Sequence, residues 1–87
     1  MKIVVHQDPG HAWFAVKRSV IDQLKLSSQI SNYSYQRGKT VYLEEDCDGP
    51  LVIDALKEIG IKFELRMGKF ASRSPIRSYD SYRVELS

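Results

Sequence analysis

Residues 40–67 read TVYLEEDCDGPLVIDALKEIGIKFELRM, and this stretch decides the fold. Residues 40–43 form a short apolar run that is typical of a strand. Pro50 suits the first turn of a helix, where a missing N–H costs nothing. Apolar residues follow at helical spacing, at Leu51, Val52, Ala55, Leu56 and Ile59. Gly60 then marks the helix end, and the alternation over 61–67 indicates a second strand, so the stretch predicts a strand–helix–strand unit.

Two further strands and a short helix are expected before this unit. Residues 2–7 and 11–17 are rich in β-branched and aromatic side chains, and the Asp8-Pro9-Gly10 turn between them predicts a hairpin. A short helix is expected over 19–26, because Ser19-Val20-Ile21-Asp22 has the form of a capping box. The single tryptophan, Trp13, is expected to pack in the core.

The segments on either side of these elements are polar and irregular. Residues 31–39 are rich in serine and tyrosine, and we expect them to lie outside the regular elements. The pattern breaks down after Gly68, and residues 82–86 suit a short edge strand. We therefore expect one α+β domain over 1–87, with a mobile loop over 68–82. Its sheet would be mainly antiparallel, with four to five strands in the order β-β-α-β-α-β and two helices packed on one face.

Composition is that of a folded domain, with 43% hydrophobic and 28% charged residues in a chain of 87. The lone cysteine, Cys47, excludes an internal disulfide and fits a reducing compartment. The apolar run after Lys2 is too short for a signal peptide, and no stretch is long enough to span a membrane. We expect a cytoplasmic protein that does not bind membranes.

Charge is unevenly distributed along the chain. The net charge of +2 combines +4 over residues 1–43, −4 over 44–48, 0 over 49–66 and +2 over 67–87. The chain is therefore dipolar rather than uniformly basic. This excludes the strong general attraction to nucleic acid that a highly basic domain has, and leaves room for a local basic patch.

The negative segment consists of Glu44, Glu45, Asp46 and Asp48, with Cys47 among them. Acids at a helix start are stabilised by free backbone N–H groups, so Asp46 or Asp48 is expected to cap the following helix. Helix capping accounts fully for one of the four carboxylates and partly for a second. The remaining negative charge suits a surface that binds a basic partner or mimics phosphate. Asp46-x-Asp48-Gly49 is too short for a calcium loop, and we expect no metal and no cofactor.

His6, His11 and Cys47 are the residues from which a nucleophile–base pair or a zinc site would have to be built. Zinc sites usually show paired short spacings, which this chain lacks. We expect His6 and His11 to be ordinary side chains of the hairpin and Cys47 to be a small residue at the helix start. We expect no catalytic residues and no enzyme activity. A small metal-dependent hydrolase that uses the acids and both histidines remains the alternative.

Arginine and tyrosine residues gather in two segments. The first holds Tyr33, Tyr35, Arg37 and Lys39, and the second holds Arg73, Arg77, Tyr79 and Arg83. Arginine interleaved with aromatic residues suits phosphate contact with base stacking, and equally suits a protein–protein contact or a plain surface loop. No phosphate-binding P-loop spacing is present.

Four strings carry a resemblance to a known family: Asp8-Pro9-Gly10-His11-Ala12-Trp13, Tyr33-Ser34-Tyr35-Gln36-Arg37-Gly38, Tyr42-Leu43-Glu44-Glu45-Asp46-Cys47-Asp48, and Arg73-Ser74-Pro75-Ile76-Arg77-Ser78-Tyr79. The chain resembles, over residues 8–82, small accessory proteins encoded by phages, plasmids and other mobile elements. That family has no assigned activity. The resemblance implies an intracellular protein of a bacterial host, of a kind that often blocks restriction or CRISPR systems.

The expected function is therefore non-catalytic binding that inhibits or modulates a host defence or nucleic-acid-processing complex. The acids of residues 44–48 would engage a basic groove of that complex, and the tyrosine and arginine side chains would supply anchors. The alternative is a nucleic-acid-binding module, in which the arginines and Lys39 contact phosphates while Tyr35 and Tyr79 stack on bases. The chain is expected to be a monomer or a homodimer.

Overall fold

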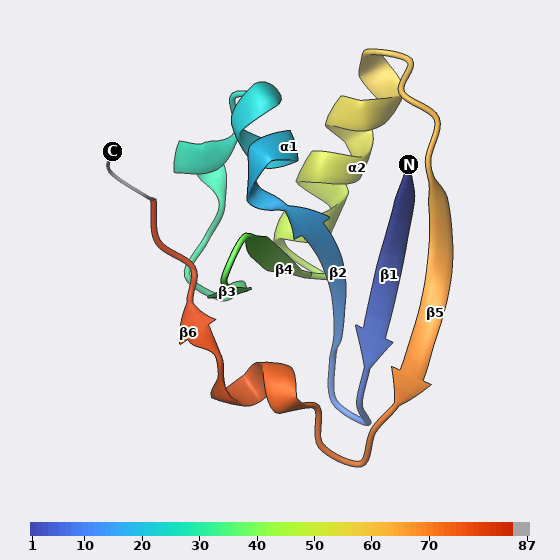
Figure 1. The fold of residues 1–87 in the computed structure, drawn as a ribbon, viewed down its shortest axis with the longest axis vertical. Coiled ribbons are helices and arrows are strands. Elements are labelled where there is room, and N and C mark those ends of the chain that lie inside the picture. The colour runs from blue at the N-terminus through green and yellow to red at the C-terminus, as the bar shows by residue number, and fades with distance from the viewer. Residues whose placement is uncertain (85–87) are drawn as a thin grey trace.

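The structure, a computed structural model, describes residues 1–84 and shows an α+β domain with an open six-stranded sheet and two α-helices (Figure 1). The elements in chain order are β1 (Lys2–Gln7), β2 (Ala12–Lys17), α1 (Arg18–Gln23), the 3-10 turn η1 (Ser27–Gln29), β3 (Tyr35–Arg37), β4 (Thr40–Glu44), α2 (Asp48–Glu58), β5 (Glu64–Phe70), the 3-10 turn η2 (Pro75–Ser78) and β6 (Asp80–Ser81). No helix among the described residues has the length and apolar character needed to cross a bilayer.

The sheet is mixed, with strand order β5-β1-β2-β4-β3-β6. The β1–β2 hairpin is confirmed, with Val4 opposite Ala15 and His6 opposite Trp13. The expectation of a mainly antiparallel sheet of four to five strands is only partly met, because β5 pairs with β1 in parallel. Parallel neighbours need a long crossover connection, and the chain through α2 brings β5 back beside β1 in the same direction (Figure 1).

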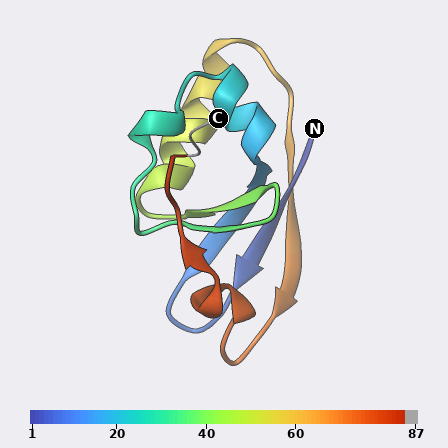
Figure 2. The ribbon, with the colours of Figure 1, turned by 60° about the vertical axis from the view of Figure 1, so that its left-hand side comes forward.

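The helices pack on one face of the sheet and form the core there (Figure 2). Alternate strand residues point toward them, namely Ile3, Val16, Val41 and Leu43. Ile21 of α1 and both Val52 and Leu56 of α2 fill the other side of this layer, and each is at most 1% exposed. Burying a side chain of this size stabilises the fold by about 1.5–3 kcal/mol.

α2 follows the sequence prediction closely, including its end. The N–H of Gly60 donates to the carbonyl of Lys57 at 3.1 Å, and the N–H of Ile61 donates to the carbonyl of Leu56 at 2.9 Å. This is the double hydrogen bond of a glycine-terminated helix, and Gly60 has the positive φ of 77° that it requires. The following strand begins at Glu64 rather than at Ile61.

Three local predictions are wrong. The segment expected to be irregular contains β3, which pairs with β4 and β6. The capping box at Ser19 does not form, because β2 runs directly into α1 and the N-cap position is Lys17, without a side-chain cap bond. Asp22 instead accepts a hydrogen bond from the Ser27 hydroxyl. The last strand is β6 at 80–81 rather than 82–86, of which 85 and 86 lie outside the described residues.

The segment after β5 runs from one edge of the sheet to the other (Figure 1). Its anchor is Ile76 in η2, which is 2% exposed. Ser74 caps η2 by accepting from the N–H of Ile76 at 3.3 Å.

Trp13 is 1% exposed, which confirms its expected core position. Beyond β6, Tyr82 joins the helix-side core and donates to the Ser27 carbonyl at 2.6 Å.

Candidate nucleic-acid interface

The sheet face opposite the helices carries two adjacent rows of residues, which the strand register defines. Cross-strand partners share a face, so each row can be followed from strand to strand. The first row runs through Lys17 of β2, Thr40 of β4 and Arg37 of β3, and Lys2 of β1 joins it when the Val4–Ala15 register is continued by two residues. The second runs through Arg66, Val4, Ala15, Tyr42 and Tyr35. These nine residues are called the open face below.

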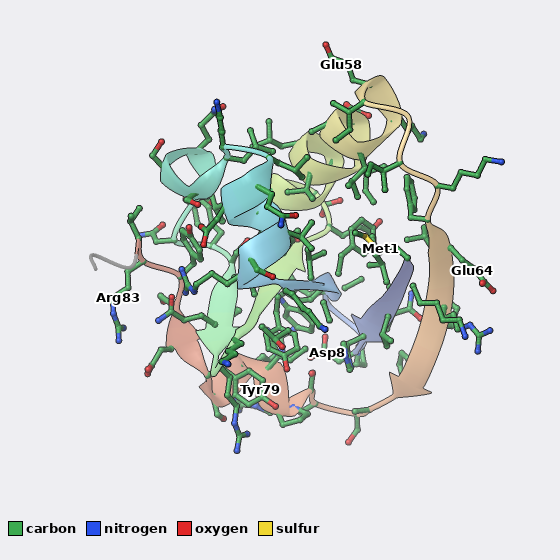
Figure 3. The ribbon with its side chains drawn as sticks, turned by 45° about the horizontal axis from the view of Figure 1, so that its top comes forward. Met1, Asp8, Glu58, Glu64, Tyr79 and Arg83 are labelled. Atoms are coloured by element: carbon green, nitrogen blue, oxygen red, sulfur yellow. The ribbon has the colours of Figure 1, made fainter. Side chains whose placement is uncertain are left out.

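The open face is basic. Lys2, Lys17 and Arg37 are exposed, and the Arg66 side chain is 53% exposed. Glu64, the register partner of Lys2, is an acid on the same face; it pairs with Arg66 at 3.4 Å and projects from the sheet edge (Figure 3). Further exposed acids lie at the start of α2 and along it, at Glu45, Asp46, Asp54 and Glu58, and others are Asp22 and Asp80. The separation of charge is partial, because Glu64 shares the open face and Lys25 and Lys57 are exposed in the helical layer.

Aromatic rings and one guanidinium group adjoin the basic row. The Tyr42 and Tyr79 rings lie 5.1 Å apart, and the Arg37 guanidinium sits over the Tyr79 ring at 4.9 Å. His6 meets Tyr42 edge to face at 5.8 Å. Burial and the neighbouring Tyr79 raise the pKa of Tyr42, so its phenol stays a neutral hydrogen-bond donor at physiological pH. Flat rings beside cations are the components of a base-stacking surface.

A buried carboxylate fixes the segment that carries Tyr79. Asp8, with a side chain 1% exposed, accepts from the backbone N–H groups of Gly10, His11 and Ser74 at 3.0–3.1 Å. It also accepts from Nε and Nη2 of Arg77, the latter at 2.8 Å. The Arg77 guanidinium beside Asp8 holds the pKa of that carboxyl well below its usual range. Asp8 therefore ties the β1–β2 turn to η2.

Arg77 also begins a second cluster, at the end of the sheet near the β1–β2 turn. Its guanidinium lies 5.5 Å from the centre of the Trp13 ring, and Nη2 is 2.9 Å from Nδ1 of His11. His11 stacks on Trp13 with ring centres 5.8 Å apart. Tyr35 of the open face meets Trp13 edge to face at 6.3 Å, so the two clusters adjoin.

The acidic segment does not form one surface. Glu44 is 7% exposed and Asp48 is 5% exposed, and of the four acids the structure presents Glu45 and Asp46 to solvent. The expected side-chain cap is absent, because the N-cap position is Cys47 and no cap hydrogen bond forms. Asp48 lies in the first turn of α2, and its carboxylate binds Ser31 instead of the helix backbone.

The Asp48 carboxylate ties the 31–34 segment to α2. It accepts from the backbone N–H of Ser31 at 3.0 Å, from the Ser31 hydroxyl at 2.7 Å, and from the Ser34 hydroxyl. The Ser34 oxygen in turn accepts from the Glu44 N–H at 3.0 Å. Asp48 therefore has a structural task that its position in an acidic run did not reveal.

His6, His11 and Cys47 do not converge. His6 contacts Tyr42 and His11 contacts Trp13, whereas the Cys47 thiol meets Glu44. The Glu44 carboxylate raises the pKa of Cys47, which favours the thiol over the nucleophilic thiolate. Among residues 1–84, no three His, Cys, Asp or Glu side chains lie where together they would hold a metal ion.

The predicted basic and aromatic residues are only partly brought together. Tyr35, Arg37, Arg77 and Tyr79 lie at or beside the open face. Lys39 is exposed in the β3–β4 turn, and Arg73 lies beside the β1–β2 turn. Arg83 points away from the body of the protein, 4.0 Å from Asp80 (Figure 3).

Sequence reasoning missed Lys2, Lys17, Tyr42 and Arg66 as members of this surface. Lys2 and Lys17 have the same strand parity as Val4 and Ala15, so the predicted hairpin already implied their shared face. Arg66 joins only through the parallel pairing of β5 with β1, which no local pattern indicates.

Comparison of the chain with protein-family models, with curated proteins and with solved structures found no match in any of the three. The site is therefore interpreted from its own chemistry.

Proposed function

We propose that this protein binds single-stranded nucleic acid on the open face of its sheet. The observation that carries the proposal is the row of Lys2, Lys17 and Arg37 beside an aromatic row, on the face that the helices leave uncovered. Adjacent strands lie about 4.8 Å apart, so this basic row extends about 14 Å across four strands. That length suits a short run of phosphates.

Single strands fit this surface better than a duplex does. Unpaired bases can stack on Tyr42, Tyr79 and the nearby His6 while the backbone follows the cations. In a duplex the base faces are hidden, and reading them requires an element that enters a groove. The open face offers side chains on a sheet surface and no such element.

The proposal predicts a specific dependence on salt. If Lys2, Lys17, Arg37 and Arg66 each contact a phosphate, log K falls against log salt with a slope of about −2.8. Affinity then falls about 50-fold between about 50 and 200 mM salt. Fluorescence anisotropy with labelled oligonucleotides of about eight nucleotides measures both quantities.

A charge-matched pair of variants tests the position of the surface. Lys17→Glu/Arg37→Glu is expected to weaken binding at least ten-fold and to halve the slope, to about −1.4. Lys25→Glu/Lys57→Glu makes the same change of net charge on exposed residues of the helical layer and is expected to leave the slope unchanged. Equal loss in both variants, or no binding by the wild type at low salt, would contradict the proposal.

We propose as a second function the inhibition of a host defence or nucleic-acid-processing complex, without catalysis by this chain. It is supported by the exposed acids Glu45 and Asp46, which lie at the start of α2 among side chains of like charge. They would meet a basic groove of the complex. Pull-down from host lysate is expected to recover a partner with the wild type and to lose it with Glu45→Lys/Asp46→Lys. Recovery by neither protein, or by both equally, counts against this function.

A further inference from the structure

A pocket of about 200 Å³ lies where Trp13 and Arg77 meet the end of β4. Its lining combines aromatic rings with hydrogen-bond donors and one carboxylate. It is called the Glu44 pocket here, and its lining is His11, Trp13, Asn32, Tyr33, Tyr35, Glu44 and Arg77. Tyr35 belongs to both the pocket and the open face, so a strand bound on the open face can place one base in the pocket.

Glu44 supplies the carboxylate of this pocket. The residue is 7% exposed, and its Oε2 accepts from the N–H of Asp46 at 3.1 Å, which holds the carboxylate in place. The residue faces Trp13 across the β2–β4 pair. A carboxylate held this firmly in a small pocket selects ligands that present N–H donors.

The pocket also shows incomplete hydrogen bonding. Nε1 of Trp13 is buried and has no hydrogen-bond partner among residues 1–84, although tryptophan N–H groups usually find one when buried. The hydrogen bonding around Trp13 is therefore incomplete, and this observation is independent of Glu44.

The aromatic lining favours a flat ligand. Tyr33 is 68% exposed, so its ring is available for stacking at the pocket rim. His11 already stacks on Trp13, with 20° between the ring planes, so the exposed Tyr33 ring is the surface left for a base. A planar base on Tyr33 gains stacking energy that is independent of its sequence context.

We propose that the Glu44 pocket recognises guanine within the single strand bound on the open face, an inference that rests on the proposed function. The N1–H and N2–H groups of guanine would donate to the Glu44 carboxylate. Its O6 and N7 acceptors would face the Asn32 amide and the Nη1 group of Arg77, since Nε and Nη2 of Arg77 bind Asp8 and His11. Adenine presents an unprotonated N1 toward the carboxylate and is disfavoured. A cationic side chain is disfavoured by the guanidinium of Arg77 in the lining.

Oligonucleotide binding tests base preference. An oligo-adenosine strand with one central guanosine is expected to bind at least ten-fold more tightly than the same strand without it. Inosine at that position, which lacks the N2 amino group, is expected to bind with intermediate affinity. Equal binding of the guanosine and adenosine strands would overturn the pocket assignment and leave the open-face proposal intact.

Variants assign the preference to Glu44. Glu44→Gln is expected to remove the guanosine preference while affinity for oligo-adenosine is retained, and Glu58→Gln is the exposed control that keeps the preference. Because Glu44 is buried, Tyr33→Ala provides a second variant at an exposed site, and it is expected to weaken guanosine-strand binding selectively. A preference that survives both changes contradicts the assignment.

Free mononucleotides separate this inference from the proposed function. Trp13 is the only tryptophan, so its fluorescence reports on the pocket without any contact on the open face. GMP is expected to change this fluorescence at lower concentration than AMP. GMP binding without oligonucleotide binding would support the pocket and refute the open face, whereas the absence of both refutes both. An arginine-rich peptide that displaces GMP and depends on Glu44 would overturn the guanine assignment in favour of a protein ligand.

Discussion

Removal of the Asp48 carboxylate is predicted to destabilise the fold far more than removal of its neighbour Asp46. Asp48→Ala leaves the Ser34 hydroxyl, which is 0% exposed, and the Ser31 N–H without their acceptor. A hydrogen bond to a charged group contributes about 1.5–3 kcal/mol. Losing two such bonds to donors held away from solvent is expected to cost about 3 kcal/mol or more. For a domain of this size that lowers Tm by roughly 12–24 °C.

Urea unfolding followed by far-UV circular dichroism measures the change. Asp46→Ala is the matched control, because its side chain is exposed, and a change within about 0.5 kcal/mol is expected. Asp48→Asn retains one acceptor oxygen and is expected to fall between the two. Equal effects at Asp46 and Asp48, or a loss below about 1 kcal/mol for Asp48→Ala, would refute the structural task assigned to this carboxylate.

Two further predictions concern the framework around the site. Asp8 has a lowered pKa in the folded state, so its stabilising contribution is complete above about pH 4 and is lost as pH falls further. The urea midpoint of the wild type should therefore fall between pH 7 and pH 2, and that of Asp8→Asn should fall less over the same range. In Gly49→Ala the new Cβ would lie 2.8 Å from two ring carbons of Phe14, and thermal melting is expected to show a loss of about 1–3 kcal/mol.

The elements that local chemistry defines were predictable from sequence. α2 carries its apolar stripe, its early proline and its terminal glycine within one short stretch, and the structure contains it as expected. The hairpin follows in the same way from Asp8-Pro9-Gly10. β3 was missed because Tyr35–Arg37 is short and polar, and it becomes a strand only by pairing with β4 and β6.

The candidate site depends more on tertiary pairing. Glu44 and Asp48 stand in one acidic run, yet one turns toward Trp13 and the other toward Ser31. The sequence therefore predicted a larger acidic surface than the fold forms. It predicted a smaller basic surface than the fold forms, because Lys17 and Arg66 are far apart in the chain and share a face only through the pairing of their strands with β1.

The most direct test of the central proposal is the mapping of amide chemical shifts while an unlabelled single-stranded oligonucleotide is added to the isotope-labelled protein. The account predicts that the largest shift changes occur on the open face, at Lys17, Arg37 and Tyr42, and that they collapse as salt is raised. Amides of α2 should change little. Shift changes concentrated on α2, or no changes at low salt, would contradict the proposal that the open face binds nucleic acid.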